Sequence, residues 1–343
     1  MTPSTILIAT PLEAEQVARI ATLDPARYRV VHHPELLPMP RYRADHSGAP
    51  RTYTADERAR WDALLAEADI LFDFDLHDPA SLPRRAPLLR WVQATSAGVG
   101  EFLDRTGLRH SGITVTTAAG THARSLAEFA LLGLLHFFRG VPHLEAEKRA
   151  RHWERYTVRG LEGARVLVVG LGAVGRETAL RCSQFGMDVW GTRRQADSAP
   201  PPGVTRLLAR DELRDALPSV DAIVLACPLT PETRLMFDEP ELARLKPGTV
   251  LVNIARGGVI NEAAMVAALR DGPLEGAALD VFAAEPLPGS SPIWDLPNVI
   301  VSPHSASTVE AENGRIVDIF LDNLGRRTRG EPLRNLYDPE RGY

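Results

Sequence analysis

Short apolar runs alternate with helical patterns along the first 120 residues of the chain. The runs that predict strands cover residues 5–9, 28–32, 70–74, 89–94 and 113–116. Helical spacing predicts helices over 12–20 and 56–68, and residues 34–50, rich in Pro, Arg and Gly, predict a long loop. Because strands that alternate with helices form parallel sheets covered by helices, this region should be a small α/β domain.

The alternation resumes after residue 160. Strands are predicted over 166–169, 187–190, 222–226, 249–254, 276–281 and 299–301, and helices over 174–185, 239–244 and 262–270. A final helix over 309–327 should return to the first domain. The pattern therefore predicts two doubly wound parallel-sheet domains of similar architecture, although no sequence repeat relates them.

A helix predicted over 125–139 is apolar around most of its circumference, through Leu126, Phe129, Leu134 and Phe138 among others. Such a helix is buried on nearly all sides, so we expect it to lie between subunits or between the two domains of one chain. The first alternative predicts a homodimer. The charged segment that follows, 145–156, contains Trp153.

The length and composition of the chain narrow the classes of function that it can have. The length of 343 residues suits two domains, and a net charge of −5 gives no support for nucleic-acid binding. Cys182 and Cys227 have neither paired nor metal-type spacing, so we expect no metal and a reducing, cytoplasmic location. The N-terminus lacks a basic segment typical of secretion signals, and the longest apolar stretch, 129–138, is too short to span a bilayer.

The strongest local signal is a G-x-G-x-x-G motif at Gly170, Gly172 and Gly175, between a predicted strand and a predicted helix. Gly170 suits a tight turn, Gly172 lets a pyrophosphate approach the backbone, and Gly175 lets the helix pack closely on the strand. The free N–H groups at the helix start would face the phosphates. The motif alone is a weak signal, but its strand–helix–strand context predicts a dinucleotide site.

The residues that should reach the adenosine ribose are Thr192, Arg193 and Arg194. Enzymes that use NAD usually place Asp or Glu about 20 residues after the motif, where its carboxylate accepts bonds from the ribose hydroxyls. Two guanidinium groups instead suit a 2′-phosphate. The sequence therefore predicts NADP, with NAD possible if both arginines point into solvent.

Polar side chains follow three of the later strands. Arg256 follows the predicted strand 249–254, and His304 follows the predicted strand 299–301. Asp280 lies near the end of the predicted strand 276–281, and Glu285 follows that strand. Each alone could be a surface or loop residue. Together they place a cation, a carboxylate and an imidazole at the carboxyl ends of strands, where α/β proteins bind ligands.

Taken together, the motifs GLGAVGR, CPLTPET, NIARGG, ALDVFAAEP and SPHSA resemble the D-isomer-specific 2-hydroxyacid dehydrogenase family. The segment VQATSAGVG, 92–100, is similar to the substrate loop of that family, and the resemblance is dense from 92 to 307. It implies a Rossmann cofactor domain, 120–305, inserted in a smaller flavodoxin-like substrate domain, 1–119 with 306–343. It also implies hydride transfer between NADP(H) and a small 2-keto acid or D-2-hydroxy acid.

The resemblance gives each matching residue a role. Arg256 would hold the substrate carboxylate and carbonyl oxygen, His304 would protonate the carbonyl, and Glu285 would favour the protonated form of His304. Asp280 would bind the nicotinamide carboxamide. The backbone amides of Ala97, Gly98 and Val99 would hold the substrate carboxylate from the other side. Cofactor contacts are expected at Gly170, Gly172, Ala173, Val174, Gly175, Thr192, Arg193, Arg194, Cys227, Pro228, Thr233, Ile254, Ala255, Arg256, Asp280, His304 and Ala306.

These roles are chemically consistent. Hydride transfer to a ketone builds negative charge on its oxygen, which a guanidinium offsets and a protonated imidazole neutralises. The planar fork of Arg also meets a carboxylate in bidentate fashion.

Two alternatives share this architecture. Formate dehydrogenases resemble the family but carry Gln where Glu285 stands, which disfavours them. A nucleotide-sensing corepressor scaffold would keep much of the site, although this chain shows no low-complexity tail.

The substrate itself is not determined by these motifs. The specificity loop should follow 70–74, where Asp73 and Asp75 make it acidic. Acidic side chains disfavour a phosphorylated or dicarboxylic substrate, unless Asp75 and Asp78 simply face solvent. Glyoxylate, hydroxypyruvate and apolar 2-keto acids all remain open.

Overall fold

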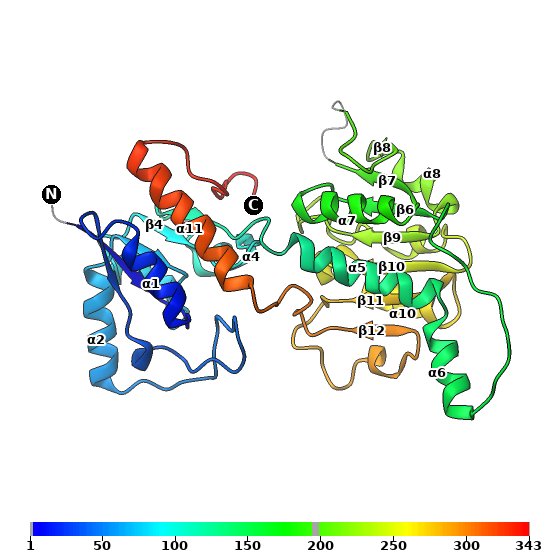
Figure 1. Ribbon diagram of the computed structural model, residues 1–343, viewed down its shortest axis with the longest axis horizontal. Coiled ribbons are helices and arrows are strands. Elements are labelled where there is room, and N and C mark those ends of the chain that lie inside the picture. Colours follow the sequence, from blue (N-terminus) through cyan, green and yellow to red (C-terminus); the bar gives the residue numbers. More distant parts are fainter. Residues whose placement is uncertain (1–2, 194–198, 343) are drawn as a thin grey trace. The chain divides into compact units, whose positions relative to one another are not determined.

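Two α/β units make up the chain in the computed structural model, which describes residues 3–193 and 199–342 (Figure 1). Unit 1 comprises Met1–His122 and Thr308–Tyr343, and unit 2 comprises Ala123–Ser307. Unit 2 is thus an insertion in the sequence of unit 1. The predicted α/β class with two parallel sheets is confirmed.

Unit 1 contains a five-stranded parallel sheet of order β2-β1-β3-β4-β5, the flavodoxin-like order. Its strands are β1 (Ser4–Ile8), β2 (Tyr28–Val31), β3 (Ile70–Phe72), β4 (Trp91–Gln93) and β5 (Thr114–Thr116). Its helices are α1 (Ala14–Thr22), η1 (Pro34–Leu36), α2 (Ala55–Ala66), η2 (Pro79–Ser81), α3 (Leu82–Arg85), α4 (Gly100–Thr106) and α11 (Glu312–Arg329).

Both faces of this sheet are apolar, because helices cover both. Leu7 and Leu71 belong to one buried cluster, and their neighbours Ile6 and Ile70 belong to the other. This follows from the two-residue period of a strand, which sends successive side chains to opposite faces. Phe320 of α11 packs on Phe72 with ring centroids 5.2 Å apart.

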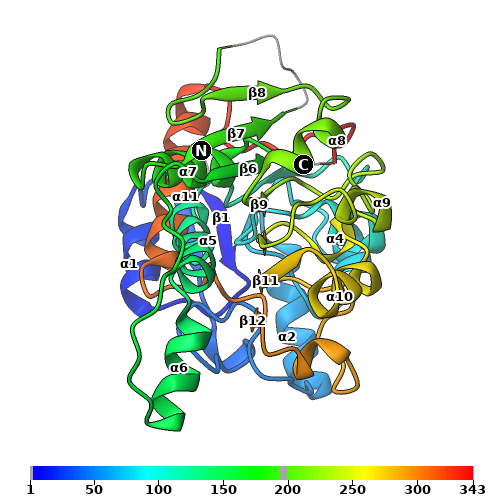
Figure 2. The same ribbon diagram turned by 90° about the vertical axis from the view of Figure 1, so that its right-hand side faces the viewer.

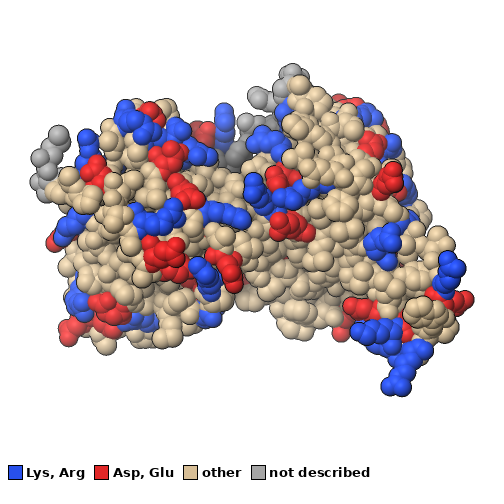
Figure 3. All heavy atoms as spheres, viewed as in Figure 1, with Lys and Arg blue, Asp and Glu red and all other residues tan. Residues whose placement is uncertain are grey.

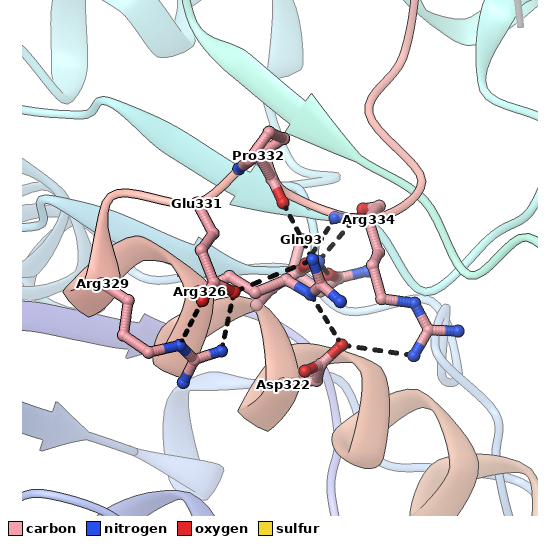
Figure 4. A network of polar contacts seen from close by, with 8 residues as sticks. Gln93, Asp322, Arg326, Arg329, Glu331, Pro332 and Arg334 are labelled. Carbon is pink, nitrogen blue, oxygen red and sulfur yellow. Dashed lines mark hydrogen bonds and ion pairs between the residues drawn. The ribbon is translucent and has the colours of Figure 1, made fainter.

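A polar network fixes the end of α11 to the sheet (Figure 4). The amide of Asn323 donates to Gln93 Oε1 (3.4 Å), and its Oδ1 accepts from the backbone N–H of Arg334 (2.7 Å). At the exposed rim, Asp322 accepts from Arg326 Nε (3.1 Å) and from Arg334 Nη1 (3.2 Å). The last helix therefore belongs to unit 1.

Unit 2 contains a seven-stranded parallel sheet of order β12-β11-β10-β9-β6-β7-β8. Its strands are β6 (Arg165–Val169), β7 (Asp188–Thr192), β8 (Arg206–Leu208), β9 (Ala222–Leu225), β10 (Thr249–Asn253), β11 (Leu274–Leu279) and β12 (Val299–Val301). Its helices are α5 (Ala123–Phe138), α6 (Val141–Ala150), α7 (Ala173–Gln184), α8 (Leu213–Ala216), η3 (Leu217–Ser219), α9 (Glu239–Leu242), η4 (Gly257–Val259), α10 (Glu262–Arg270) and η5 (Pro292–Asp295). The strand order reverses between β6 and β9, the switch point where Rossmann folds bind dinucleotides.

Figure 2 shows α5 and α7 on one face of this sheet and α9 and α10 on the other. Five apolar residues of α5 belong to a buried cluster of unit 2, namely Ala130, Leu131, Leu134, Phe137 and Phe138. Gly133 lies so close to the sheet that an added Cβ would be 2.5 Å from the Ala278 side chain. This sheet therefore covers part of the apolar surface of α5, while Leu132 is exposed, and the expected burial of the helix between domains or subunits stays a prediction.

Several short elements were not predicted, among them α4, α6, α8 and β8. None of the residues of α6 is buried, so no apolar period marks it. In Figure 3 the side chains of both signs lie interspersed on the face shown. Among the residues that the structure describes, no helix has both the length and the apolar content to cross a membrane. Within those same ranges, no group of three His, Cys, Asp or Glu side chains is placed to hold a metal ion.

Candidate functional site

The glycine-rich turn between β6 and α7 has the geometry that its spacing predicted. Gly170 has φ +96°, and a Cβ there would lie 2.7 Å from the Cα of Cys227. A Cβ on Gly175 would overlap the carbonyl oxygen of Gly170, so helix and turn are in close contact. A Cβ on Gly172, by contrast, would meet no described atom within 4 Å. The backbone is therefore open at Gly172, where a phosphate group would need room.

The end of β7 is fixed onto this turn. The backbone N–H groups of Gly170 and Leu171 both donate to the Thr192 carbonyl at 3.1 Å. Arg193 follows at once, and its Nη2 donates to the Ala199 carbonyl (3.3 Å). The predicted contact Arg194 lies outside the described residues. Thr192 and Arg193 are thus held next to the glycine-rich turn.

A second turn follows β9 and contains Cys227, Pro228 and Thr233. The hydroxyl of Thr233 donates to the Pro228 carbonyl (2.6 Å) and accepts from the backbone N–H of Thr230 (2.8 Å). Cys227 is buried, and this burial raises the pKa of its thiol to about 11. The thiol therefore stays protonated near neutral pH and contributes packing rather than nucleophilic chemistry.

The loop after β10 carries Arg256 and is shaped by Asn253, which is fully buried. Its side-chain oxygen accepts from the Ala255 N–H (3.1 Å), and its amide donates to the Arg256 carbonyl (3.3 Å). Ile254 and Ala255 are buried, whereas Arg256 is half-buried and donates from Nη1 to the Ala255 carbonyl (2.7 Å).

Asp280, at the end of β11, is buried and holds the chain that leaves β12. Its Oδ1 accepts from the Ser302 hydroxyl (2.6 Å) and from the backbone N–H of Ala306 (2.9 Å). The carboxylate thereby fixes the segment on both sides of His304. Neither Ser302 nor Asn253 was singled out from the sequence, although both are polar residues in or next to the strand-end motifs that were.

Glu285 and His304 form a direct pair, with Glu285 Oε2 2.7 Å from His304 Nδ1. The other carboxylate oxygen of Glu285 accepts from the Phe282 N–H (3.0 Å), which orients the carboxylate. The His304 side chain is 44% exposed, so a ligand can reach it. His304 has φ +53°, and the Glu285–Pro286 peptide is cis.

Contacts connect these three strand ends in series. A Cβ on Gly257, next to Arg256, would overlap the backbone of Phe282, so the loops after β10 and β11 touch. The loop after β11 carries Glu285, which bonds to His304 after β12. The structure thus brings the Arg256 loop, Asp280, Glu285 and His304 together at one edge of the unit 2 sheet.

The predicted substrate loop belongs to unit 1. Ala97 and Gly98 are exposed between β4 and α4, whereas Val99 is buried in the core of that unit. The neighbouring turn after β3 corrects one expectation. Asp75 is buried and ion-paired with Arg85, so it neither faces solvent nor presents a free negative charge to a substrate.

The other two acidic residues near this turn are also engaged. Asp73 is buried and accepts from the Thr95 hydroxyl (2.7 Å). Asp78 accepts from the Ser81 hydroxyl (2.5 Å). Because Asp73, Asp75 and Asp78 are all hydrogen-bonded or ion-paired within the protein, they do not disfavour an anionic substrate, and our expectation that they would was wrong.

A family model described as "D-isomer specific 2-hydroxyacid dehydrogenase, NAD binding domain" matches residues 131–306. Among curated proteins, (S)-sulfolactate dehydrogenase of Chromohalobacter salexigens is 37% identical over 246 residues, 71% of this chain and 78% of that protein. Glyoxylate reductase of Korarchaeum cryptofilum is 33% identical over 277 residues, 77% of this chain and 81% of that protein. D-3-phosphoglycerate dehydrogenase of Mycobacterium leprae is 36% identical over 262 residues, 75% of this chain, but the match spans only 48% of that longer relative.

Solved structures of related proteins resemble the fold of this protein over nearly the whole length of the chain. A D-isomer specific 2-hydroxyacid dehydrogenase family protein from Aeromonas salmonicida has a TM-score of 0.81 at 28% identity, with 98% of this chain and 100% of that chain covered. An enzyme of this family from Xanthobacter autotrophicus, in complex with NADPH and MES, has a TM-score of 0.77 at 29% identity, with both chains fully covered. An NADPH-dependent glyoxylate/hydroxypyruvate reductase from Sinorhizobium meliloti, in complex with NADP and sulfate, has a TM-score of 0.78 at 26% identity, with 99% and 100% covered.

The family model covers half of the chain, and its span includes the glycine-rich turn and the Glu285–His304 pair. The full-length structural matches extend the likeness to unit 1. On these grounds the chain belongs to the D-isomer specific 2-hydroxyacid dehydrogenase family.

Proposed function

We propose that the protein reduces small 2-keto acids to D-2-hydroxy acids with NADPH as the preferred electron donor. The observation that carries this proposal is the 2.7 Å contact between Glu285 and His304 at the carboxyl edge of the sheet that also bears the glycine-rich turn. In this proposal residues 120–305 form the dinucleotide-binding domain, and residues 1–119 with 306–343 form the substrate domain.

The residues around the turn fit a bound dinucleotide. The open space at Gly172 leaves room for a pyrophosphate beside the first N–H groups of α7, a helix of 12 residues. When bound, the reduced nicotinamide supplies the hydride. Asp280 would accept a bond from the nicotinamide carboxamide, and the turns at Cys227, Pro228, Thr233, Ile254 and Ala255 would contact the rest of the cofactor.

His304 is the proposed proton donor. Glu285 accepts at Nδ1, which leaves Nε2 of the imidazole available to a substrate. In this proposal His304 donates a proton to the ketone oxygen, and Glu285 holds the imidazole in position for that transfer. In the reverse direction neutral His304 would accept the proton of the hydroxy acid.

Arg256 is the proposed carboxylate and carbonyl contact. Its guanidinium would offset the charge that develops on the ketone oxygen while also holding the substrate carboxylate. The exposed backbone at Ala97 and Gly98, with Val99, is the proposed second contact for that carboxylate.

The choice of NADPH rests on the sign of the charge after β7. Arg193, held next to the turn, can meet a 2′-phosphate with a charge-assisted hydrogen bond, where NAD-using enzymes carry an acid. Two structural relatives with NADP(H) bound support the same choice.

The test is NADPH oxidation with a panel of 2-keto acids, including glyoxylate and hydroxypyruvate. Turnover with at least one acid, and a higher kcat/KM with NADPH than with NADH, is the expected result. Tight NADPH binding without turnover of any acid would instead favour the nucleotide-sensing scaffold.

A further inference from the structure

The segment that follows α11, residues 331–342, runs back across unit 1 (Figure 1). Its start is held by the polar network at the end of α11, where Asn323 Oδ1 accepts from the Arg334 N–H (2.7 Å). Leu336 then forms an antiparallel bridge with Thr116 of β5, the edge strand of the five-stranded sheet. No sequence motif pointed to this segment, and nothing proposed so far gives it a function.

Asn335 connects the segment to the start of the proposed substrate loop. Its side-chain amide donates to the carbonyls of Thr117 (3.2 Å) and Ala119 (2.8 Å), and its own carbonyl accepts from the Thr117 N–H (2.9 Å). The Ala118 N–H donates to the carbonyl of Ser96, the residue just before the loop (3.0 Å). Asn335 therefore fixes the stretch of backbone to which the start of the loop is hydrogen-bonded.

Gly342 contacts the other end of the loop. A Cβ on Gly100, the residue just after the loop, would overlap the carbonyl oxygen of Gly342, so the two backbones touch. Val99, the last loop residue, is buried in the same cluster as Tyr337. The segment thus supports both ends of the loop, directly at its end and through residues 117–119 at its start.

The end of the segment has its own anchors. Asp338 folds it into a turn, since Oδ1 accepts from the Glu340 N–H (2.9 Å) and the carbonyl accepts from the Gly342 N–H (2.9 Å). Arg109, which follows α4, donates from Nη1 to the Pro339 carbonyl (2.6 Å). None of these hydrogen bonds involves the substrate loop, so the segment can act as a fixed support for it.

We propose that the segment 335–342 positions the backbone amides of Ala97, Gly98 and Val99 for the carboxylate of the 2-keto acid. The inference rests on the proposed reductase function and makes Asn335 and Gly342 positioning residues, which act through the loop. Ala97 and Gly98 are exposed, so their order depends on the residues that flank them. Backbone donors that are already oriented bind an anion at a lower cost in conformational entropy than donors that must first be ordered.

The test measures kcat, the KM of the acid that the unmodified protein reduces best, and the affinity for NADPH. Asn335 has φ +55°, which glycine adopts readily, so Asn335→Gly removes two hydrogen bonds and preserves the backbone conformation. Gly100→Ala places a methyl group against the Gly342 carbonyl, at a helical position that otherwise favours alanine.

Both variants should raise the keto-acid KM between roughly tenfold and a hundredfold, the effect of a small misplacement of a binding group. The value of kcat should fall less, because the carboxylate contact of the loop serves binding more than the chemical step. NADPH affinity, measured by fluorescence titration, should stay unchanged, since the proposed dinucleotide site lies in unit 2. The same titration shows that each variant is folded.

The matched control is Arg329→Met, which removes two hydrogen bonds to Glu331 (2.7 and 2.9 Å) at an exposed site near the start of the segment. It should leave the keto-acid KM unchanged. If one of the two test variants does not fold, the other still decides.

An unchanged keto-acid KM in a folded test variant, or an equal loss of affinity for NADPH and the keto acid, would overturn the positioning role and leave the reductase function standing. No oxidation of NADPH with any acid by the unmodified protein would overturn the proposed function, and the positioning role with it.

Discussion

At the scale of single residues, the contact with Glu285 is the feature that orients the imidazole of His304. Their side chains are 35% and 44% exposed, so solvent weakens the pair without removing it. The carboxylate is also oriented by the Phe282 N–H, which holds it in hydrogen-bonding position to the imidazole. The role proposed for His304 as proton donor therefore depends on this one neighbour.

We expect Glu285→Gln to retain partial activity and to move the pH optimum of keto-acid reduction to lower pH. The amide keeps the shape of the side chain but not the charge that stabilises the imidazolium. pH profiles of kcat/KM for both forms measure the shift. His304→Gln serves as the reference and should abolish reduction with NADPH affinity nearly intact; an active His304 variant would mean that another group supplies the proton.

Arg193→Asp should reverse the nucleotide preference. The substitution removes a donor to the 2′-phosphate and introduces an acceptor for the ribose hydroxyls. A difference of a few kcal/mol would change the ratio of kcat/KM between NADPH and NADH by tens to hundreds of fold, since about 1.4 kcal/mol is a factor of ten. The keto-acid KM should change little, and a preference for NADH in the unmodified enzyme would contradict the assignment.

The positions of Glu285 and His304 were predictable because both residues follow strand ends within short motifs. Asp75 was not, because its environment depends on a partner ten positions away, Arg85, which no local pattern identifies. Two polar residues that shape the strand-end loops, the buried Asn253 and the half-buried Ser302, were missed for the same reason. Their function depends on which backbone groups the fold presents to them.

At the scale of elements, the three glycines of the turn before α7 perform separable tasks. Gly175 is needed for the contact between helix and turn, whereas the position of Gly172 is open and its backbone is extended, with φ −71° and ψ −161°. An alanine can adopt that conformation. Helix packing therefore depends on Gly175, whereas the proposed phosphate contact depends on Gly172.

We expect Gly175→Ala to lower the free energy of unfolding by about 1–3 kcal/mol, as overpacking does. Gly172→Ala should change it by less than about 1 kcal/mol but should weaken NADPH binding about tenfold or more, because the methyl group occupies the space for the phosphates. Denaturant unfolding and a fluorescence titration of NADPH separate the two effects. Unchanged NADPH affinity in Gly172→Ala would argue against a dinucleotide at this turn.

The segment 37–53 depends on one carboxylate. Hydrogen bonds from the Arg41 side chain and from the Arg41 and Gly48 backbone hold the pKa of the Asp45 carboxyl well below its usual range. A lowered pKa in the folded state stabilises the protein above the unfolded pKa, about 3.9, and this contribution is lost as the pH falls below it.

Asp45→Asn should therefore cost roughly 2 kcal/mol near pH 7, the scale of hydrogen bonds to a charged group. The difference from the unmodified protein should shrink as the pH falls below about 3.9. Thermal unfolding across this range measures both. The control is Asp318→Asn, which removes an ion pair with a 63% exposed carboxylate and should have little effect at any pH.

The strong elements of the fold were predictable from their periodicity, and the weak ones were not. Helix α10 has the predicted bounds, because one face of it is buried. Helix α6 buries nothing and β8 has three residues, so neither leaves a pattern long enough to recognise. For α5 the apolar content was recognised, but sequence alone could not reveal which of its residues pack in the core of unit 2.

At the scale of the whole molecule, the exposed apolar surface suggests how copies of the chain associate. Next to α6, Trp153 is 96% exposed, and Leu144 and Tyr156 are 47% and 42% exposed. The three residues lie close together in the sequence, and contiguous exposed apolar surface usually marks an interface. These exposed side chains are a second reason, beside the apolar helix α5, to expect a homodimer.

Light scattering at micromolar concentration should give the mass of a dimer, and Trp153→Asp should shift the population toward monomer without loss of thermal stability in the monomeric fraction. A large aromatic side chain at an interface contributes disproportionately to its affinity. A control substitution at exposed Met39, in the other unit, should leave the mass unchanged. A monomeric mass for the unmodified protein would contradict the predicted homodimer.

The two cysteines of the chain are buried, so their reactivity depends on local opening of the fold. Cys182 and Cys227 both lie in unit 2, and burial raises the pKa values of their thiols to about 12 and about 11. A thiol reagent attacks the thiolate, so it can label either side chain only when unit 2 opens far enough to admit solvent. The rate of alkylation should therefore report how often unit 2 opens, independently of unit 1. A molecule that binds to folded unit 2 should slow alkylation, whether or not the protein converts that molecule.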